Sequence, residues 1–229
     1  MYHFKLEVVM LIALFLIGFL ISVNAKNKLN RNTDVSNCEL GTSKDSDVEE
    51  LPFDPDYNLK HFIDGMADKL KCSIYVKECS ISTTMNARPV LFSLFGKRSK
   101  RKYIIRINNR IDFKGAKLHE VPLDAKVGLW YHELMHIKDY QSRSFWGILK
   151  RGIQYLSIKG KRVFENEIDR MVISDGYGKY LYQWSHYSMN ASNISEKYKA
   201  FKSAIYLTPQ QISQELLLNH LSPAMNVVY

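Results

Sequence analysis

Residues 131–140 of the sequence read YHELMHIKDY, and two histidines in this stretch stand four positions apart. On a helix, residues at that spacing lie one above the other, so His132 and His136 would present their imidazoles to a single point. Glu133 follows the first histidine, where its carboxylate would flank a metal ion without binding it. This HExxH pattern predicts a zinc ion (Zn²⁺) held by two histidines, with Glu133 as the base that takes a proton from water.

The alternative interpretation is an ordinary helix with two histidines on its surface, since so short a pattern also arises by chance. The neighbouring residues weaken that alternative, because they surround both histidines with apolar side chains and so predict a buried helix. Buried histidines beside a carboxylate need polar partners, and a metal ion supplies one. The apolar neighbours are Val127, Leu129, Trp130, Leu134, Met135 and Ile137.

A catalytic zinc ion takes three protein ligands and keeps one position open. One class of zinc enzymes has a third histidine six residues after the second, and Ser142 at that position excludes it. Further along, VFENEIDR at 163–170 places Glu165 and Asp169 four residues apart on one helix face. We expect Glu165 to be the third ligand and Asp169 to orient a ligating histidine through a hydrogen bond. Glu167 is the alternative ligand, or else a plain exposed glutamate.

HELMH followed by ExxxD resembles the gluzincin pattern of zinc metallopeptidases. That group includes integral-membrane CAAX-type proteases and small soluble gluzincins. The resemblance implies zinc at His132, His136 and Glu165, with Glu133 as the general base. The sequence lacks the many membrane-spanning segments of the CAAX-type enzymes, so the resemblance does not extend to their membrane-embedded substrates.

The stretch FENEIDRMVISDGYGKYLYQW is also similar to part of a set of uncharacterised bacterial metallopeptidase-like proteins. In those proteins FExxTD leads into a glycine pair and an aromatic-rich helix, and a later LSPEEI resembles LTPQQI at 207–212. Ile168 stands where that pattern has Thr or Ala, a difference that leaves the metal ligands unchanged. The resemblance covers residues 127–212.

The resemblance to zincins implies further that the strand before the metal-binding helix, Tyr103–Asn108, offers its edge to an extended peptide. A hydrogen-bond donor for the oxyanion of the reaction is expected on the segment after Asp169. For each candidate, aromatic packing in the core is the better explanation. The candidates are Tyr177, Tyr180, His186 and Tyr187.

The elements that must position these side chains follow from the apolar periodicity. It predicts an α+β fold, with a small antiparallel sheet packed on a mostly helical, zincin-like half that carries the HExxH helix. The expected strands are 73–81, 90–95 and 103–107. The expected helices are 58–70, 122–141, 145–157, a segment from Arg162 that bends near Gly176 and Gly178, and a last helix starting at Thr208-Pro209-Gln210-Gln211.

The N-terminal residues contain an unbroken apolar run, Val8–Val23, and the position after Ala25 suits a signal peptidase. We therefore expect residues 1–25 to be a cleaved signal peptide, or otherwise a membrane anchor. Either places the folded part outside the cytoplasm, secreted or periplasmic in the first case and membrane-anchored in the second. Residues 26–53 are a polar linker with too few large apolar residues to fold alone, and the metallopeptidase-like domain spans 54–229.

The chain has 32 Lys and Arg residues against 23 Asp and Glu, a net charge of +9 that favours contact with anionic surfaces. Residues 96–102, GKRSKRK, are expected to form an exposed hairpin tip. This tip is either a solvated turn or a contact with anionic lipid, cell-wall polymer or substrate. Nucleic acid is not expected, because no aromatic residues alternate with these cations. The cations are Lys97, Arg98, Lys100, Arg101 and Lys102.

The three cysteines suit an extracytoplasmic compartment without requiring one. Cys72 and Cys79 flank an apolar stretch and either pair across a turn or remain free thiols, and Cys38 would be left over. No CxxC spacing occurs, so cysteine is not expected to bind the metal.

Three functions fit these expectations. The leading one is an exported zinc endopeptidase acting on a peptide or protein substrate. The second is a zinc amidase acting on cell-wall or other non-protein amide bonds. The third is a membrane-tethered binding module with structural zinc. Glu133 argues against the third, because a structural site needs no base and closes with four ligands.

Overall fold

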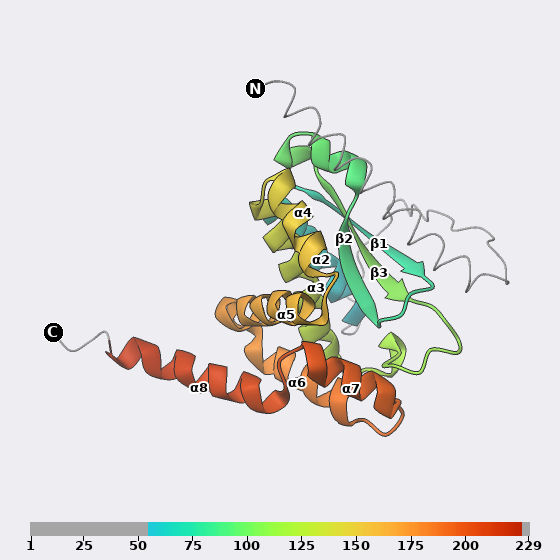
Figure 1. Cartoon of the computed structure of the whole chain (residues 1–229), viewed down its shortest axis with the longest axis vertical. Helices are drawn as coiled ribbons and strands as arrows, with labels where there is room; N and C mark the ends of the chain where they lie inside the picture. The colour runs from blue at the N-terminus through green and yellow to red at the C-terminus, as the bar shows by residue number, and fades with distance from the viewer. Residues whose placement is uncertain (1–54, 226–229) are drawn as a thin grey trace, which may run out of the picture. The chain divides into compact units, whose positions relative to one another are not determined.

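The computed structural model describes residues 55–225, and the side chains of residues 63–219 (Figure 1). The expected signal peptide, the linker and Cys38 lie outside this part of the chain. The structure confirms an α+β fold, with a small sheet and a mostly helical remainder. The strands are β1 (Ser73–Cys79), β2 (Met85–Pro89) and β3 (Lys102–Asn108). The helices are α2 (Pro55–Leu70), α3 (Leu123–Ser142), α4 (Phe145–Gln154), α5 (Ile158–Val172), α6 (Gly178–Asn190), α7 (Glu196–Ile205) and α8 (Pro209–Met225).

The sheet is mixed and has the strand order β1-β3-β2. The central strand β3 is parallel to β1 and antiparallel to β2, with Ile105 opposite Val76 on one side and Ala87 on the other. The expectation that the sheet is antiparallel throughout is wrong. After β1 the chain crosses to the far edge for β2 and returns to the centre for β3. The apolar pattern of a strand indicates which face is buried, but not the direction of its neighbours.

The strand expected at 90–95 is also wrong, because Leu91–Phe95 forms a 3-10 helix, η1. The strand in this region is β2, in which only Met85 and Ala87 are both apolar and buried. Because only two alternating apolar residues precede Pro89, the sequence pattern for this strand is weak. A terminal proline nevertheless suits a strand at the edge of a sheet.

The basic segment 96–102 does lie at the end of a hairpin, because β2 and β3 are consecutive antiparallel strands, but their connection is longer than expected. The segment contains a second 3-10 helix, η2 (Arg98–Lys100), followed by the first residue of β3. A hydrogen bond of 2.9 Å from the backbone N–H of Val90 to the carbonyl of Lys102 closes the loop between β2 and β3.

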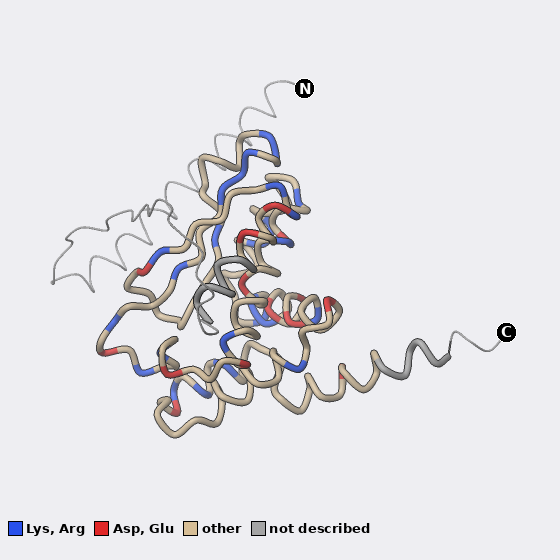
Figure 2. Tube along the Cα trace, turned by 180° about the vertical axis from the view of Figure 1, so that it is seen from behind, with Lys and Arg blue, Asp and Glu red and all other residues tan. Residues whose placement is uncertain are grey.

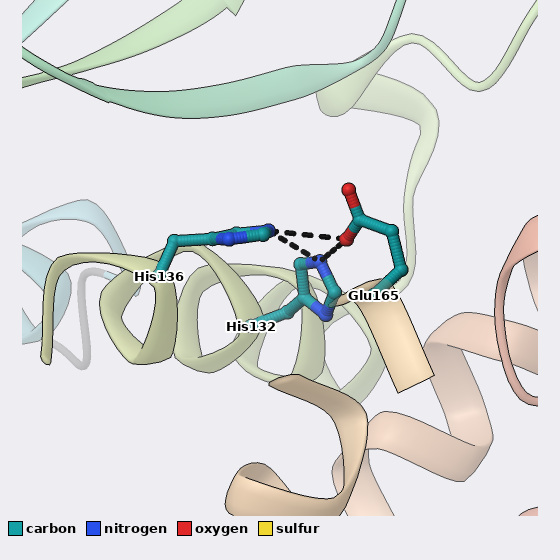
Figure 3. A group of neighbouring side chains, drawn as sticks. All are labelled: His132, His136 and Glu165. Atoms are coloured by element: carbon teal, nitrogen blue, oxygen red, sulfur yellow. Dashed lines mark hydrogen bonds and ion pairs between the residues drawn. The ribbon is translucent and has the colours of Figure 1, made fainter. Parts of the chain in front are cut away.

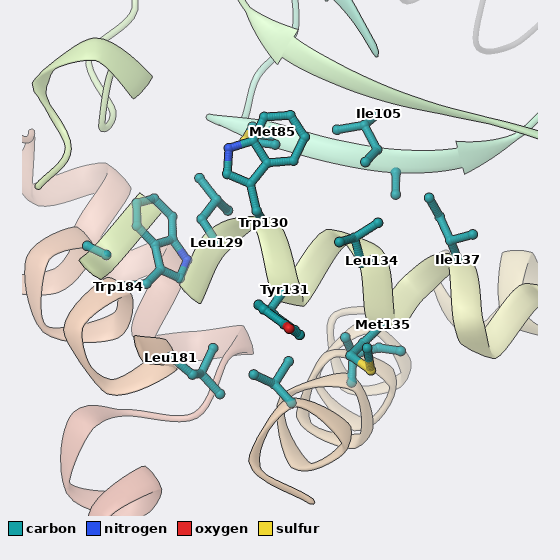
Figure 4. Packing of buried hydrophobic residues seen from close by; sticks show 14 of the residues in the cluster. Met85, Ile105, Leu129, Trp130, Tyr131, Leu134, Met135, Ile137, Leu181 and Trp184 are labelled. Atoms are coloured by element: carbon teal, nitrogen blue, oxygen red, sulfur yellow. The ribbon is translucent and has the colours of Figure 1, made fainter. Parts of the chain in front are cut away.

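Helix α3 lies between the sheet and helices α5 and α6, and its residues from Gly128 to Ile137 are all buried. On one side Leu134 and Ile137 face Ile105 of the sheet (Figure 4). On the other side α3 packs against α5 and α6. Gly128 permits this close approach, since a Cβ there would lie 2.1 Å from the backbone oxygen of Tyr180 in α6.

Two local signals in the helical half are confirmed. A π-helical turn, η4 (Ile173–Tyr177), separates α5 from α6, and Gly176 in it has a φ of 91°, so the chain bends where the glycine pair predicted. At the start of α8, Thr208 Oγ1 accepts a hydrogen bond from the backbone N–H of Gln211. Gln211 Oε1 accepts one from the backbone N–H of Thr208, which completes a capping box.

Cys72 and Cys79 are free thiols at the two ends of β1. Because a strand rises ~3.3 Å per residue, they lie about 23 Å apart, far beyond the reach of a disulfide. The helices within residues 55–225 include none that combines the length and apolar character needed to cross a bilayer.

Candidate metal centre

Two helices bring the three expected ligands together. His132 and His136 project from α3 towards α5, and Glu165 projects from α5 towards them (Figure 3). The Nε2 atoms of the two histidines are 3.1 Å apart, and Glu165 Oε2 lies 3.1 Å from each of them. The three atoms therefore form an equilateral triangle, which we call the ligand triangle.

The ligand triangle has the size that a tetrahedral zinc site needs. Nitrogen and oxygen ligands lie ~2.0–2.1 Å from zinc, so two tetrahedral ligands are about 3.3 Å apart. A proton bridges only two of the three atoms, whereas one cation between them contacts all three. Among the residues that the structure describes, this is the one group of three or more His, Cys, Asp or Glu side chains with such convergence.

Asp169 lies behind His132, on the side away from the ligand triangle. Its Oδ1 is 2.8 Å from Nδ1 of His132, and its Oδ2 accepts a hydrogen bond of 2.9 Å from the backbone N–H of Leu207. When Nδ1 donates its proton to Asp169, Nε2 presents a lone pair to the triangle. Glu165 and Asp169 act on two sides of one histidine because they are a single helical turn apart on α5.

The charges at the site favour a cation. Burial alone would lower the pKa of His132, but hydrogen bonds with Asp169 and Glu165 raise it to about 10. Burial alone would raise the pKa of Glu165, yet His136 and His132 hold it well below its usual range. Glu165 is therefore ionised, and the imidazoles sit where positive charge is stabilised. A metal ion supplies that charge as a proton does.

Glu133 is buried beside the histidines, and one of its oxygens has no hydrogen-bond partner. The residue is 4% exposed, and its Oε2 bonds to no described residue; the same holds for Nδ1 of His136. Burial raises the pKa of Tyr206, and the negative charges of Glu165 and Glu133 raise it further. Both carboxylates therefore lie close enough to the Tyr206 hydroxyl to affect it. An unpaired carboxylate oxygen in a buried position costs stability, which indicates a partner during function.

Two tyrosines at the site were missed in the sequence. The Tyr155 hydroxyl donates to Glu165 Oε1, the oxygen outside the ligand triangle. The ring of Tyr206 lies 5.5 Å from the ring of His132, centroid to centroid. Both tyrosines belong to short connections, one between α4 and α5 and one before α8. Outside helices and strands, apolar periodicity does not indicate which side chains are buried. The sequence therefore contained no indication that these two tyrosines lie at the site.

The aromatic candidates expected after Asp169 have other neighbours. Tyr177 stacks on Tyr131 and lies beside Tyr180. Tyr187 donates a hydrogen bond of 3.1 Å to a backbone carbonyl, and His186 is exposed. For Tyr177 and Tyr187 these contacts agree with the expectation of structural packing.

The structure separates Glu167 from the histidines. Its carboxylate is 45% exposed and forms an ion pair of 2.6 Å with Arg151 of α4. Arg151 also binds Asp139 of α3 at 2.8 Å, so this charged group ties three helices together. Glu165, two positions earlier, is fully buried and faces the opposite way.

The expectation that Tyr103–Asn108 offers a free edge is wrong, because β3 has a partner strand on each side. Strand β2 stands at the edge instead, packs against α3, and passes over the three ligands (Figure 3). The strands at the two edges of this sheet are therefore β1 and β2, and β2 is the one beside the ligands.

A buried lysine adds positive charge on the Asp169 side of the site. Lys202 of α7 has its Nζ 3.6 Å from the ring centroid of Tyr206 and 5.1 Å from that of Trp184. Burial lowers the pKa of Lys202 to about 8, while the charges of Glu165 and Asp169 act in the opposite direction. The lysine thus offsets part of the negative charge that the buried carboxylates bring.

The chain matches no protein-family model, and comparisons with curated proteins and with solved structures find no match either. The function must therefore be inferred from the geometry of the site.

Proposed function

We propose that the protein is a zinc-dependent hydrolase, and specifically a metallopeptidase. The observation that carries the proposal is the ligand triangle of His132, His136 and Glu165 with an unpaired oxygen of Glu133 beside it. Three ligands leave the fourth tetrahedral position free for a reactant, as in catalytic zinc sites, whereas structural sites use four.

Each residue of the site has a role that its contacts support. Zinc, when bound, supplies a Lewis acid that polarises a carbonyl and lowers the pKa of a bound water to ~7. Glu133 takes the proton of the attacking water and passes it to the leaving amine. Asp169 keeps His132 in the tautomer that binds metal, and Tyr155 holds Glu165 by its second oxygen.

The position of β2 supports a peptide substrate. Within the described part of the chain, β2 pairs with β3 alone, and its other edge lies on the side of α3. An extended peptide that adds to this edge gains backbone hydrogen bonds whatever its side chains are. Such a peptide would run past the ligands, so we favour peptide bonds over other amides as the substrate.

Glu133→Gln in the purified full-length protein tests this proposal. The variant should keep its zinc, because Glu133 is not a ligand, and should lose peptide hydrolysis by about 10²–10⁴-fold, the usual contribution of a general base. Zinc is measured by metal analysis and hydrolysis with a peptide library. Glu167→Gln is the matched control and should retain both.

Two results would contradict the proposal. Equal hydrolysis by the wild type and Glu133→Gln would remove Glu133 from the reaction. Stoichiometric zinc in a wild-type protein that cleaves neither the peptide library nor a cell-wall polymer digest would indicate a structural zinc site.

A further inference from the structure

The 3-10 helix η1 and helix α4 expose apolar side chains side by side. Phe92 is 89% exposed and Trp146 is 55% exposed. The ring of Phe145 links the two elements, because its centroid lies 5.0 Å from that of Phe95 and 5.3 Å from that of Trp146. We call this surface the η1–α4 patch. It consists of Leu91, Phe92, Phe95, Phe145, Trp146 and Ile153.

The packing of α4 keeps its apolar outer face exposed to solvent. Ile148 and Arg151 are buried on the inner face of α4, where Arg151 binds Asp139 of α3. Trp146 and Ile153 are two turns apart on the opposite face, and both are more than half exposed. Because the inner face is fixed by a buried ion pair, α4 cannot roll over to cover its outer face.

The patch lies in a part of the chain that contains no acidic residue. Residues 79–111 and 140–164, which carry the patch, hold fourteen of the 32 Lys and Arg residues and none of the 23 Asp and Glu. The loop with η1 and η2 lies at the same end of the fold as α4, and basic positions gather there (Figures 1 and 2). Eight of the fourteen cations are exposed and form no ion pair with a described acidic residue, and five of the eight lie in the basic segment 96–102 or on α4, namely Lys97, Arg98, Lys100, Lys102 and Lys150.

Arg101 does not belong to this group, contrary to the expectation that the whole basic segment 96–102 is exposed. It is buried, and its Nη1 donates to the backbone carbonyl oxygens of Tyr140 at 3.2 Å and Arg143 at 2.7 Å. Arg101 therefore attaches the basic loop to the C-terminal end of α3. That attachment fixes η1 beside α4, so the apolar and basic residues form one surface.

We propose that the η1–α4 patch docks on an anionic lipid surface. Exposed aromatic and aliphatic side chains enter the interface of a bilayer, while flanking Lys and Arg bind the negatively charged headgroups. An anionic bilayer complements both features of the patch, its apolar centre and its uncompensated positive charge. The apolar run Val8–Val23 in the sequence, which is expected to direct the chain to a membrane, supports lipid as the occupant over a second protein.

The three tryptophans provide a direct test with the full-length protein. Trp146 is on the patch, whereas Trp130 and Trp184 are buried in the core. In vesicles that contain phosphatidylglycerol, brominated acyl chains should quench the part of the fluorescence that Trp146→Phe removes. In phosphatidylcholine vesicles this quenching should be several times weaker. Because the signal comes from Trp146, it reports contact by the patch even when residues 8–23 hold the chain on both kinds of vesicle.

Matched variants separate the patch from general surface effects. Phe92→Asp should reduce the quenching of Trp146 at least fivefold, whereas Ile111→Asp should leave it unchanged. Ile111 is 93% exposed, but it lies beyond the opposite end of β3. The double substitution Lys97→Glu with Lys100→Glu should also reduce quenching. The control is Lys179→Glu with Lys197→Glu, which changes the net charge equally at exposed positions outside the patch.

The absence of lipid quenching at Trp146 in phosphatidylglycerol vesicles would overturn the proposal, as would self-association through the patch without lipid. Equal quenching in both kinds of vesicle would overturn the role assigned to the anionic headgroups. None of these outcomes depends on zinc or hydrolysis, so the proposal stands or falls separately from the proposed enzymatic function.

Discussion

The carboxylate of Asp169 faces two partners, the Nδ1 atom of His132 and the backbone N–H of Leu207. Asp169→Asn keeps the shape of the side chain but removes its charge and turns one acceptor oxygen into a donor. We predict a loss of zinc affinity of about 10–100-fold, measured by competition with a chelator. Asp175→Asn, which changes an aspartate paired with Lys138 at 2.6 Å, should leave the affinity unchanged. Unchanged affinity in Asp169→Asn would mean that His132 needs no support.

Tyr155 supports a second ligand, because its hydroxyl donates a hydrogen bond to the oxygen of Glu165 that lies outside the ligand triangle. Tyr155→Phe should weaken zinc binding about tenfold, and excess zinc should restore hydrolysis. Tyr75→Phe is the control, since Tyr75 on β1 is 42% exposed and Tyr155 is 39% exposed. A loss of kcat that excess zinc fails to restore would instead place the Tyr155 hydroxyl on the substrate.

At the scale of elements, the site depends on how closely α3 approaches α6. Gly128→Ala should destabilise the protein by about 3 kcal/mol, because its Cβ would meet backbone atoms of Tyr180 that cannot move aside. Gly152→Ala, in the exposed face of α4 with nothing within 4 Å of the new Cβ, should stabilise it by about 0.5–1 kcal/mol. Denaturant unfolding measures both. Equal stability of the two variants would contradict the close packing of α3 on α6.

The sequence predicted the helices better than the strands, for a physical reason. The start of α8 and the bend at Gly176 depend on residues within one or two turns, so their signals are local. The strands depend on partners far along the chain. Strand β2 has only two buried apolar side chains, yet β3 pairs with it. The more apolar segment 91–95 instead forms η1 and leaves Phe92 exposed.

At the scale of the whole molecule, the same division between local and distant information holds for the site. The spacing of His132 and His136 is local, and the one-turn spacing of Glu165 and Asp169 within α5 is local too. Neither spacing shows that α5 lies against α3, which was expected because a zinc ion needs a third ligand and Glu165 with Asp169 could supply it, as the resemblance to gluzincins also implies. The contributions of Tyr155, Tyr206 and Lys202 come from separate connections and helices, and only the folded chain brings them to the ligands.

The segregation of charge is a further property of the whole molecule. A net charge of +9 indicates only a basic protein, but residues 79–111 and 140–164, which carry the exposed aromatic residues of the η1–α4 patch, combine fourteen cations with no acidic residue. The proposed metal centre, by contrast, gathers the buried carboxylates of Glu133, Glu165 and Asp169. The chain thus places negative charge inside, where a cation would bind, and positive charge on the η1–α4 patch.

The zinc content of the purified full-length protein tests the central claim most directly. Metal analysis should find one zinc ion per chain in the wild type and in Glu167→Gln. It should find little or none in His136→Ala and in Glu165→Ala, provided that circular dichroism shows all four proteins folded. A wild-type protein that takes up no zinc, or folded ligand variants that retain a full equivalent of it, would contradict the account.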